Sequence, residues 1–72
     1  MGPVAGAGAG PVDLNTADAA ALESLPGIGP VTAAAILAWR SANGAFTSVD
    51  QLVEVDGIGP ATLAKLRPLV TV

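Results

Sequence analysis

Two copies of the tetrad Gly-Ile-Gly-Pro carry the residues in this sequence that could do chemistry. They occupy positions 27–30 and 57–60. Glycine lets an outside group approach the backbone closely and adopts a positive φ without steric cost. Proline suits the first turn of a helix, where a missing N–H breaks no hydrogen bond. Each tetrad therefore predicts a turn into a new helix, whose unpaired N–H groups and positive dipole end would bind a phosphate-sized anion.

The residues around the tetrads repeat with the same spacing of 30 positions. The matched pairs are Leu22 and Leu52, Leu25 and Val55, Thr32 and Thr62, Ala34 and Ala64, and Ile36 and Leu66. Such a period indicates one supersecondary unit built twice. Each unit is expected to be a helix, a tight hairpin and a second helix, with Ile28 or Ile58 anchoring the hairpin in the core. Two hairpins suggest two phosphates.

Other interpretations of Gly-Ile-Gly require residues that the sequence lacks. A dinucleotide-binding fingerprint needs a preceding strand, a third glycine and a downstream acidic residue. A P-loop needs Gly-x-x-x-x-Gly-Lys-Ser/Thr, which is also absent. A turn that uses glycine for packing alone remains the structural alternative, and the duplication with matched flanking residues disfavours it.

Composition limits the chemistry further. The 72 residues suffice for one small domain with a marginal core. The chain has no cysteine and no histidine, so it lacks thiolate ligands, the usual zinc ligands and the usual general base. No apolar run reaches 18 residues and no signal-peptide pattern is present, so we expect no membrane span in this sequence.

The first residues differ in composition from the rest. Residues 1–11 are mostly Gly, Ala and Pro, which predicts a flexible linker or a remnant of an expression vector. Residues 12–72 are expected to fold. We interpret the chain as a C-terminal domain excised from a longer protein.

Hydrophobic spacing and capping residues predict four helices, and hence an all-α fold. The first begins after Asp18 or Thr16 and runs to Leu25. The second covers residues 31–41, with an inner stripe of Ala33, Ile36, Leu37 and the stem of Arg40.

Asn43-Gly44 should end the second helix, and Phe46 should fill the following loop. Ser48 and Gln51 predict a capping box for a third helix that carries Val49, Leu52 and Val53. The fourth helix should cover residues 61–67. We expect the core to be closed by Leu14, in the lead-in segment before the first helix, and by Leu69, Val70 and Val72, in the tail after the fourth helix.

Several segments together resemble the DNA-binding domains of the ComEA family of bacterial competence proteins. They are residues 12–17 (Val-Asp-Leu-Asn-Thr-Ala), 25–30 (Leu-Pro-Gly-Ile-Gly-Pro), 39–40 (Trp-Arg), 43–46 (Asn-Gly-Ala-Phe) and 68–72 (Pro-Leu-Val-Thr-Val). The resemblance covers about sixty residues, nearly the whole part expected to fold. The hairpin alone occurs in many repair proteins, but the lead-in, the Asn-Gly-x-Phe loop and the 30-residue spacing are more specific.

The resemblance implies a tandem helix-hairpin-helix domain that binds double-stranded DNA without sequence preference. In this family an N-terminal transmembrane helix and a linker hold the protein to the cell envelope, where it passes incoming DNA to the uptake machinery. The implied partners are duplex DNA and other DNA-uptake proteins. We expect this fragment to be soluble and monomeric in isolation.

The family motif assigns binding groups to both hairpins of this sequence. The backbone N–H groups of Gly27, Gly29, Val31 and Thr32 would hold one phosphate, and those of Gly57, Gly59, Ala61 and Thr62 another. In the wider motif family, hairpin carbonyls also cradle Na⁺ or K⁺. Here these would be the carbonyls of Glu23, Leu25 and Ile28, and of Val53, Val55 and Ile58. No other cofactor is implied.

The charge balance opposes strong DNA binding. Phosphate contacts normally come from Lys and Arg, but the chain has 3 basic and 6 acidic residues. Lys65 and Arg67 follow the second hairpin, and we assign them to DNA. Arg40 is expected to be structural, while Asp56 lies unfavourably beside the second phosphate site.

The remaining residues favour a binding module over an enzyme. Trp39 and Phe46 are too few for a stacking platform on single strands and are expected in the core. The scattered carboxylates predict no catalytic pair. Two further functions stay open at this point: a protein–protein interaction module, and a DNA-targeting module of an intracellular repair or recombination protein.

Overall fold

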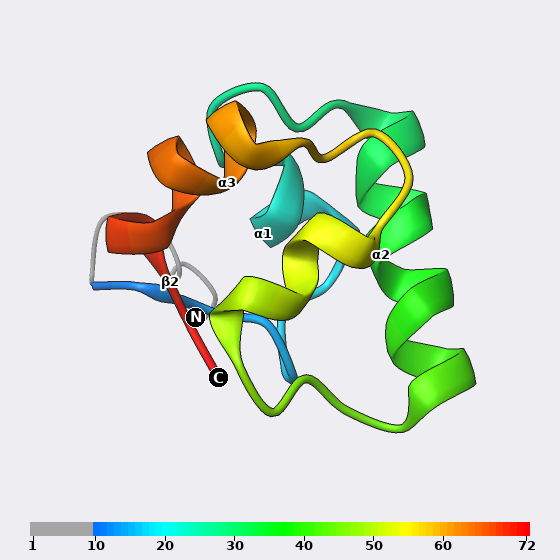
Figure 1. Cartoon of the computed structure of the whole chain (residues 1–72). Helices are drawn as coiled ribbons and strands as arrows, with labels where there is room; N and C mark the ends of the chain where they lie inside the picture. Colours follow the sequence, from blue (N-terminus) through cyan, green and yellow to red (C-terminus); the bar gives the residue numbers. More distant parts are fainter. Residues whose placement is uncertain (1–9) are drawn as a thin grey trace.

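The computed structural model of this protein describes residues 10–72. The linker predicted for residues 1–11 therefore lies almost entirely outside the described residues. Figure 1 shows helices packed around one core, with two short strands that bring the ends of the described chain together. In chain order the elements are β1 (Val12–Asp13), α1 (Ala19–Glu23), α2 (Pro30–Asn43), η2 (Val49–Glu54), α3 (Pro60–Leu66), η3 (Arg67–Leu69) and β2 (Val70–Thr71), where η marks a 3-10 helix.

The sequence repeat is also a repeat of burial. The paired positions Leu22 and Leu52, Leu25 and Val55, Ile28 and Ile58, and Ile36 and Leu66 are all buried in one core. The pair Ala34 and Ala64 is exposed in both units. Each large apolar side chain removed from water contributes about 1.5–3 kcal/mol of hydrophobic free energy. The same pattern therefore stabilises both halves, and the predicted duplication is confirmed.

Helix α1 begins where its capping residue predicts. The Asp18 carboxylate accepts a hydrogen bond from the Ala21 N–H at 2.9 Å, which satisfies one of the free donors of the first turn. The helix ends at Glu23, two residues before the predicted end at Leu25. Pro26 disfavours helical backbone at Leu25, so Leu25 is buried from the turn instead.

Helix α2 is the longest element. It runs two residues beyond the predicted end at Ser41, to Asn43. Gly44 then adopts a φ of 91°, and its N–H bonds to the Arg40 carbonyl, as expected for a glycine-terminated helix. Phe46 is buried behind this turn, which confirms its predicted place. Among residues 10–72, no helix is long and apolar enough to cross a lipid bilayer.

Ser48 and Gln51 form the predicted capping box, but the helix that follows is a 3-10 helix. A 3-10 helix has three residues per turn, so side chains three positions apart share a face. Leu52 and Val55 are thereby buried, and Val49 packs beside them. Val53 falls on the outer face and is 44% exposed. Val53 thus lies on the predicted helix with Val49 and Leu52 but outside the core.

The chain ends close the fold through strands that the sequence did not predict. β1 and β2 pair in parallel, with Val12 opposite Val70 and Asp13 opposite Thr71. The Leu14 N–H extends the pairing to the Thr71 carbonyl at 2.8 Å. Val70 is buried as expected.

Two other tail residues depart from the prediction. Leu69 and Val72 are 40% and 43% exposed, so their assignment to the core was wrong. Leu69 lies in the single turn of η3, and Val72 lies beyond the last strand pair.

Polar side chains fasten the lead-in to the rest of the domain. The Arg40 guanidinium donates to the carbonyls of Leu14 and Ala17 at 3.0 and 2.8 Å. Asn15 donates to the Phe46 carbonyl and accepts from the Phe46 N–H. These bonds join the Leu-Asn-Thr-Ala segment to the Trp-Arg and Asn-Gly-x-Phe segments. They also give Arg40 the structural role that was predicted for it.

Candidate functional site

The first hairpin presents unpaired backbone donors at the start of α2. Gly27 turns the chain with a φ of 80°, and the Ile28 N–H bonds to the Leu25 carbonyl at 3.2 Å. Gly29 is the N-cap, and its carbonyl accepts the first bond of the helix, from the Ala33 N–H at 2.9 Å. Within residues 10–72, the N–H groups of Gly29, Val31 and Thr32 have no acceptor.

The second hairpin repeats this geometry at the start of α3. Gly57 has a φ of 97°, and the Ile58 N–H bonds to the Val55 carbonyl at 3.1 Å. Gly59 is the N-cap, and its carbonyl accepts from the Leu63 N–H at 2.9 Å. The N–H groups of Gly59, Ala61 and Thr62 likewise find no acceptor in the described part of the chain.

The two glycines of each tetrad have different roles. The first, Gly27 or Gly57, has the positive φ that makes the turn. The second, Gly29 or Gly59, has an extended backbone with φ near −100° that any residue could adopt. A Cβ built on Gly29 or Gly59 would meet no protein atom within 4 Å. Neither backbone conformation nor protein packing therefore requires the second glycine, and the space on its Cβ side is open.

The two hairpins touch each other. A Cβ on Gly57 would lie 3.2 Å from the Thr32 Oγ1 and 3.7 Å from its Cγ2. The first turn of α2 therefore lies against the second hairpin. Gly27 has no such neighbour within 4 Å. The sequence repeat predicted equivalent hairpins and gave no sign of this one-sided contact.

The side chains that flank the unpaired amides supply no positive charge, and Asp56, directly before Gly57, adds a negative one at the second hairpin. Ile28 and Ile58 are each only 4% exposed and anchor the hairpins in the core, as expected. Val31 is 83% exposed beside the first hairpin, and Ala61 is exposed at the matching position. Attraction for an anion at the hairpins must therefore come from backbone N–H groups and helix dipoles.

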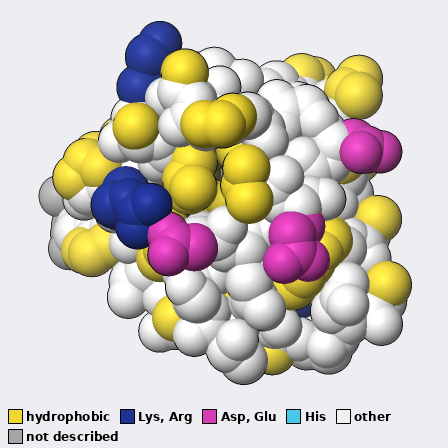
Figure 2. Space-filling view, viewed as in Figure 1, with side chains coloured by type: hydrophobic (Ala, Val, Ile, Leu, Met, Phe, Trp, Pro, Cys, Tyr) yellow, Lys and Arg dark blue, Asp and Glu magenta, His cyan; other side chains and the backbone are white. Residues whose placement is uncertain are grey.

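Basic side chains are sparse on the surface. On the face shown in Figure 2, two groups of Lys and Arg atoms lie among apolar and acidic side chains, without a continuous basic surface. Lys65 is exposed on α3, five residues after the start of that helix at Pro60.

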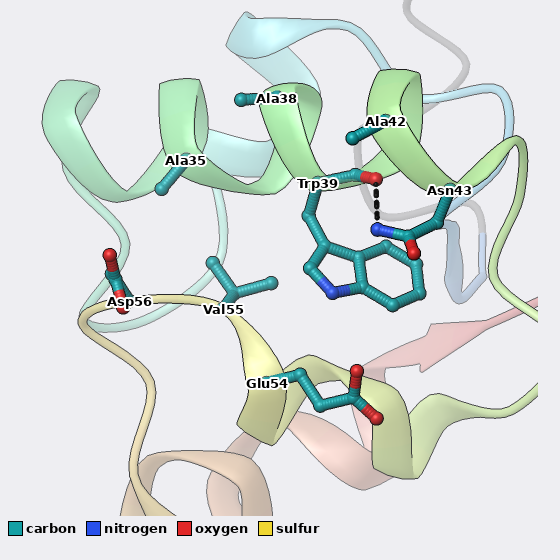
Figure 3. A pocket seen from close by; sticks show the side chains of 8 residues that line it. All are labelled: Ala35, Ala38, Trp39, Ala42, Asn43, Glu54, Val55 and Asp56. Carbon is teal, nitrogen blue, oxygen red and sulfur yellow. Dashed lines mark hydrogen bonds between the residues drawn. The ribbon is translucent and has the colours of Figure 1, made fainter.

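The two aromatic residues pack on each other. The Trp39 and Phe46 rings are stacked, with centroids 4.4 Å apart and planes at 19°. Phe46 is buried, as predicted, whereas Trp39 is only partly buried against the core. The indole also forms part of a shallow groove between α2 and the segment Glu54–Asp56 (Figure 3).

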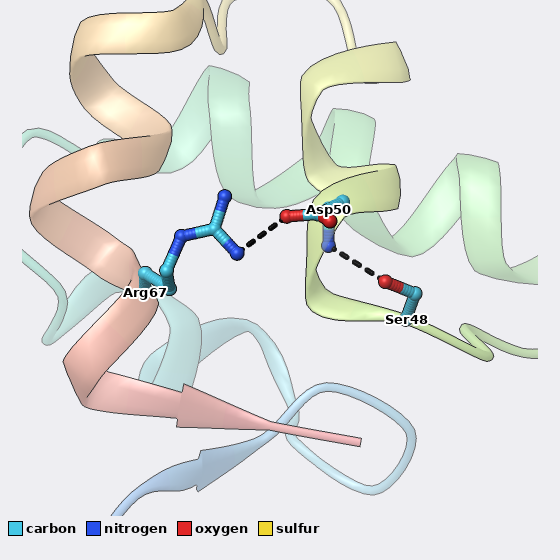
Figure 4. Close-up of polar contacts among 3 residues, drawn as sticks. All are labelled: Ser48, Asp50 and Arg67. Atoms are coloured by element: carbon cyan, nitrogen blue, oxygen red, sulfur yellow. Dashed lines mark hydrogen bonds and ion pairs between the residues drawn. The ribbon is translucent and has the colours of Figure 1, made fainter.

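Arg67 lies at the end of α3 remote from the hairpin. Its guanidinium forms an ion pair with Asp50 at the start of η2, beside the Ser48 cap (Figure 4). Both side chains of the pair are more than half exposed, so the pair contributes little to stability and can reorganise. The roles of Lys65 and Arg67 on DNA stay predictions.

Some of the hairpin carbonyls predicted as cation ligands are free. Within the described residues, the carbonyls of Glu23 and Ile28, and of Val53 and Ile58, accept no hydrogen bond. Those of Leu25 and Val55 each accept one, which leaves a second lone pair. The role of these carbonyls as cation ligands stays a prediction.

The sequence was compared with known proteins. A family model described as helix-hairpin-helix motif matches residues 8–71. ComE operon protein 1 of Bacillus subtilis (strain 168) is 38% identical over 61 residues, which are 85% of this chain and 30% of the relative. An uncharacterized protein of Haemophilus influenzae is 47% identical over 57 residues, 78% of this chain and 51% of the relative.

A third relative is a much longer protein. Human endonuclease/exonuclease/phosphatase family domain-containing protein 1 is 41% identical over 56 residues, 78% of this chain and 10% of the relative. The chain therefore spans about half or less of each relative's length. The duplicated hairpins and the matched family model agree: the chain belongs to the helix-hairpin-helix family and is a domain of the ComEA type.

Proposed function

We propose that this domain binds double-stranded DNA without sequence preference through the backbone of its two hairpins. The proposal rests on two neighbouring helix starts with unpaired backbone amides. Each helix is preceded by a glycine whose Cβ position has no protein atom within 4 Å. One phosphate would be held by the N–H groups of Gly27, Gly29, Val31 and Thr32, and a second by those of Gly57, Gly59, Ala61 and Thr62. Membership of the helix-hairpin-helix family supports it.

The absence of sequence preference follows from the kind of contact. Phosphate contacts fix the position of a protein on a duplex but carry no base information. Two sites held together by the contact of Thr32 with Gly57 would bind two phosphates at one fixed separation, as a duplex presents them. A flexible single strand would have to be ordered on binding, so it should bind more weakly.

A monovalent cation fits the same hairpins. The carbonyls of Glu23, Leu25 and Ile28 would hold one Na⁺ or K⁺, and those of Val53, Val55 and Ile58 another. A cation there supplies positive charge beside a phosphate oxygen, which this acidic chain otherwise lacks.

We further propose that the domain is the DNA-receptor part of a competence protein in the cell envelope, acting with other DNA-uptake proteins. The name and similarity of ComE operon protein 1 support this role. The domain acts as a binding module without catalysis of its own, as a monomer before it meets DNA. A segment of about 20 apolar residues encoded upstream would support the envelope location, whereas an upstream nuclease or other repair domain would contradict it.

Substitution of the open glycines tests the DNA-binding proposal. Gly29→Val and Gly59→Val place a branched side chain where each phosphate would lie, and the extended backbone at both positions tolerates it. Both variants should remain folded by circular dichroism and lose most binding to a duplex. Ala20→Val, at an exposed position of α1 outside the hairpins, is the control. A folded Gly59→Val variant with wild-type affinity would remove the second hairpin from the site.

A further inference from the structure

A shallow groove lies along α2, on the side that faces η2 and the second hairpin. One wall is a row of small side chains from Ala35, Ala38 and Ala42 with the indole of Trp39. The other wall is the segment Glu54–Asp56 (Figure 3). Asn43 closes the end of the groove near Ala42, and Asp56 lies at the other end near Ala35.

The polar groups of this groove are mainly acceptors. Within residues 10–72, neither Glu54 nor Asp56 pairs with a cation. The Asn43 amide nitrogen donates to the Trp39 carbonyl at 2.9 Å, which leaves the amide oxygen as a free acceptor. Two carboxylates, an amide oxygen and an indole thus surround a surface of alanine methyl groups.

Within residues 10–72, none of the three basic side chains pairs with a carboxylate of the groove. Arg40 is bonded to two carbonyls of the lead-in, and Arg67 is paired with Asp50. Residues 1–9 contain no basic side chain. Lys65, exposed on α3, forms no ion pair within residues 10–72, so both carboxylates of the groove lack a cationic partner there.

We propose that this groove docks an arginine-bearing segment of a partner protein. A guanidinium has five N–H donors in a planar arrangement, and it forms charge-assisted bonds with carboxylates and stacks on aromatic rings. One arginine would pair with Glu54 beside the indole of Trp39, and a second would pair with Asp56 near Ala35. Small residues beside each arginine would pack on Ala35, Ala38 and Ala42, because the groove is too shallow there for larger side chains.

The position of the groove gives the docking a consequence for DNA, which rests on the proposed function. Asp56 directly precedes Gly57 of the second hairpin, so its carboxylate disfavours a phosphate there. A bound guanidinium would neutralise this charge and strengthen DNA binding at that hairpin. Docking itself needs no DNA, so it is tested separately.

The single tryptophan of the chain makes the test direct. The probe is a capped five-residue peptide with arginine at both ends and three alanines between them, titrated into the isotope-labelled chain without DNA. The Trp39 indole N–H and the backbone amides of Ala38 and Ala42 should shift together and saturate. The same peptide with citrulline in place of arginine, which keeps the shape and removes the charge, should give no saturable shift.

Matched variants identify the groups responsible. Glu54→Gln with Asp56→Asn should weaken peptide binding by about tenfold, as expected for the loss of two exposed ion pairs. Glu23→Gln, an exposed carboxylate outside the groove, should leave it unchanged. Ala42→Leu should also weaken binding, because it fills the groove without changing charge.

Four results would overturn the proposal. They are equal shifts with arginine and citrulline peptides, equal binding of a lysine peptide, an unchanged affinity of the double variant, and shifts of Trp39 caused by self-association of the chain. The last would show that a second copy, and not a partner, occupies the groove. If docking holds while duplex binding fails, the proposed function is wrong and the groove remains an interaction site.

Discussion

The two turn glycines should differ in their tolerance of alanine, although the sequence presents them as equivalent. Gly27→Ala and Gly57→Ala each force a side chain into a positive φ, of 80° and 97° respectively. That conformation costs an L-residue about 1–2 kcal/mol, partly offset by about 0.4–1 kcal/mol from the less flexible unfolded chain. We therefore expect Gly27→Ala to lower the free energy of unfolding by about 1 kcal/mol.

Gly57→Ala has a second cost. Its Cβ would lie 3.2 Å from the Thr32 Oγ1, so the Thr32 side chain or the first turn of α2 must give by a few tenths of an ångström. Overpacking of this kind costs about 1 kcal/mol or more. The melting temperature of Gly57→Ala should therefore lie about 4–8 °C below that of Gly27→Ala, as expected for a difference of 1 kcal/mol in a domain of this size.

Urea unfolding in a double-mutant cycle isolates the contact. Thr32→Ala removes both atoms nearest to the added Cβ. It should recover much of the extra loss in Gly57→Ala and none of the loss in Gly27→Ala. Equal losses in the two glycine variants, or no coupling between positions 32 and 57, would refute the packing of one hairpin on the other.

Three other predictions concern charged side chains. Arg40→Ala should lower the unfolding free energy by about 2–4 kcal/mol, since it removes two bonds from a charged donor, while duplex affinity of the folded fraction stays unchanged in a titration. The logarithm of the duplex-binding constant should fall with the logarithm of salt concentration with a slope of roughly −2, and Lys65→Ala should make this slope less steep by about one. A slope steeper than about −5 would require another basic surface. Asp50→Asn should free Arg67 and tighten binding at low salt, and unchanged affinity would remove Arg67 from the DNA contact.

Much of the fold can be predicted from local residue chemistry, because each structural unit occurs twice in the sequence and both copies show the same hydrophobic pattern. Positions Leu22 and Leu52, or Ile36 and Leu66, predict burial in both units, and the structure confirms it. Caps at Asp18 and Ser48 set helix starts through short-range hydrogen bonds. Such features depend on neighbours within one or two turns, so a sequence pattern can reveal them.

Features that depend on the assembled chain were missed. The pairing of Val12 with Val70 joins opposite ends of the domain, and two-residue strands leave no alternating pattern to detect. The 3-10 geometry of η2 changed the helical period and turned Val53 outward. The contact between Thr32 and Gly57, and the groove beside Trp39, arise only when the two units pack.

If backbone amides of both hairpins hold DNA phosphates, a titration of the isotope-labelled chain with two duplexes of equal length and unrelated sequence should reveal these contacts. The amides of Gly29, Val31, Gly59 and Ala61 should show the largest shifts, with equal affinities for the two duplexes. Largest shifts away from both hairpins, or a preference above about tenfold (about 1.4 kcal/mol) for one duplex, would contradict the account.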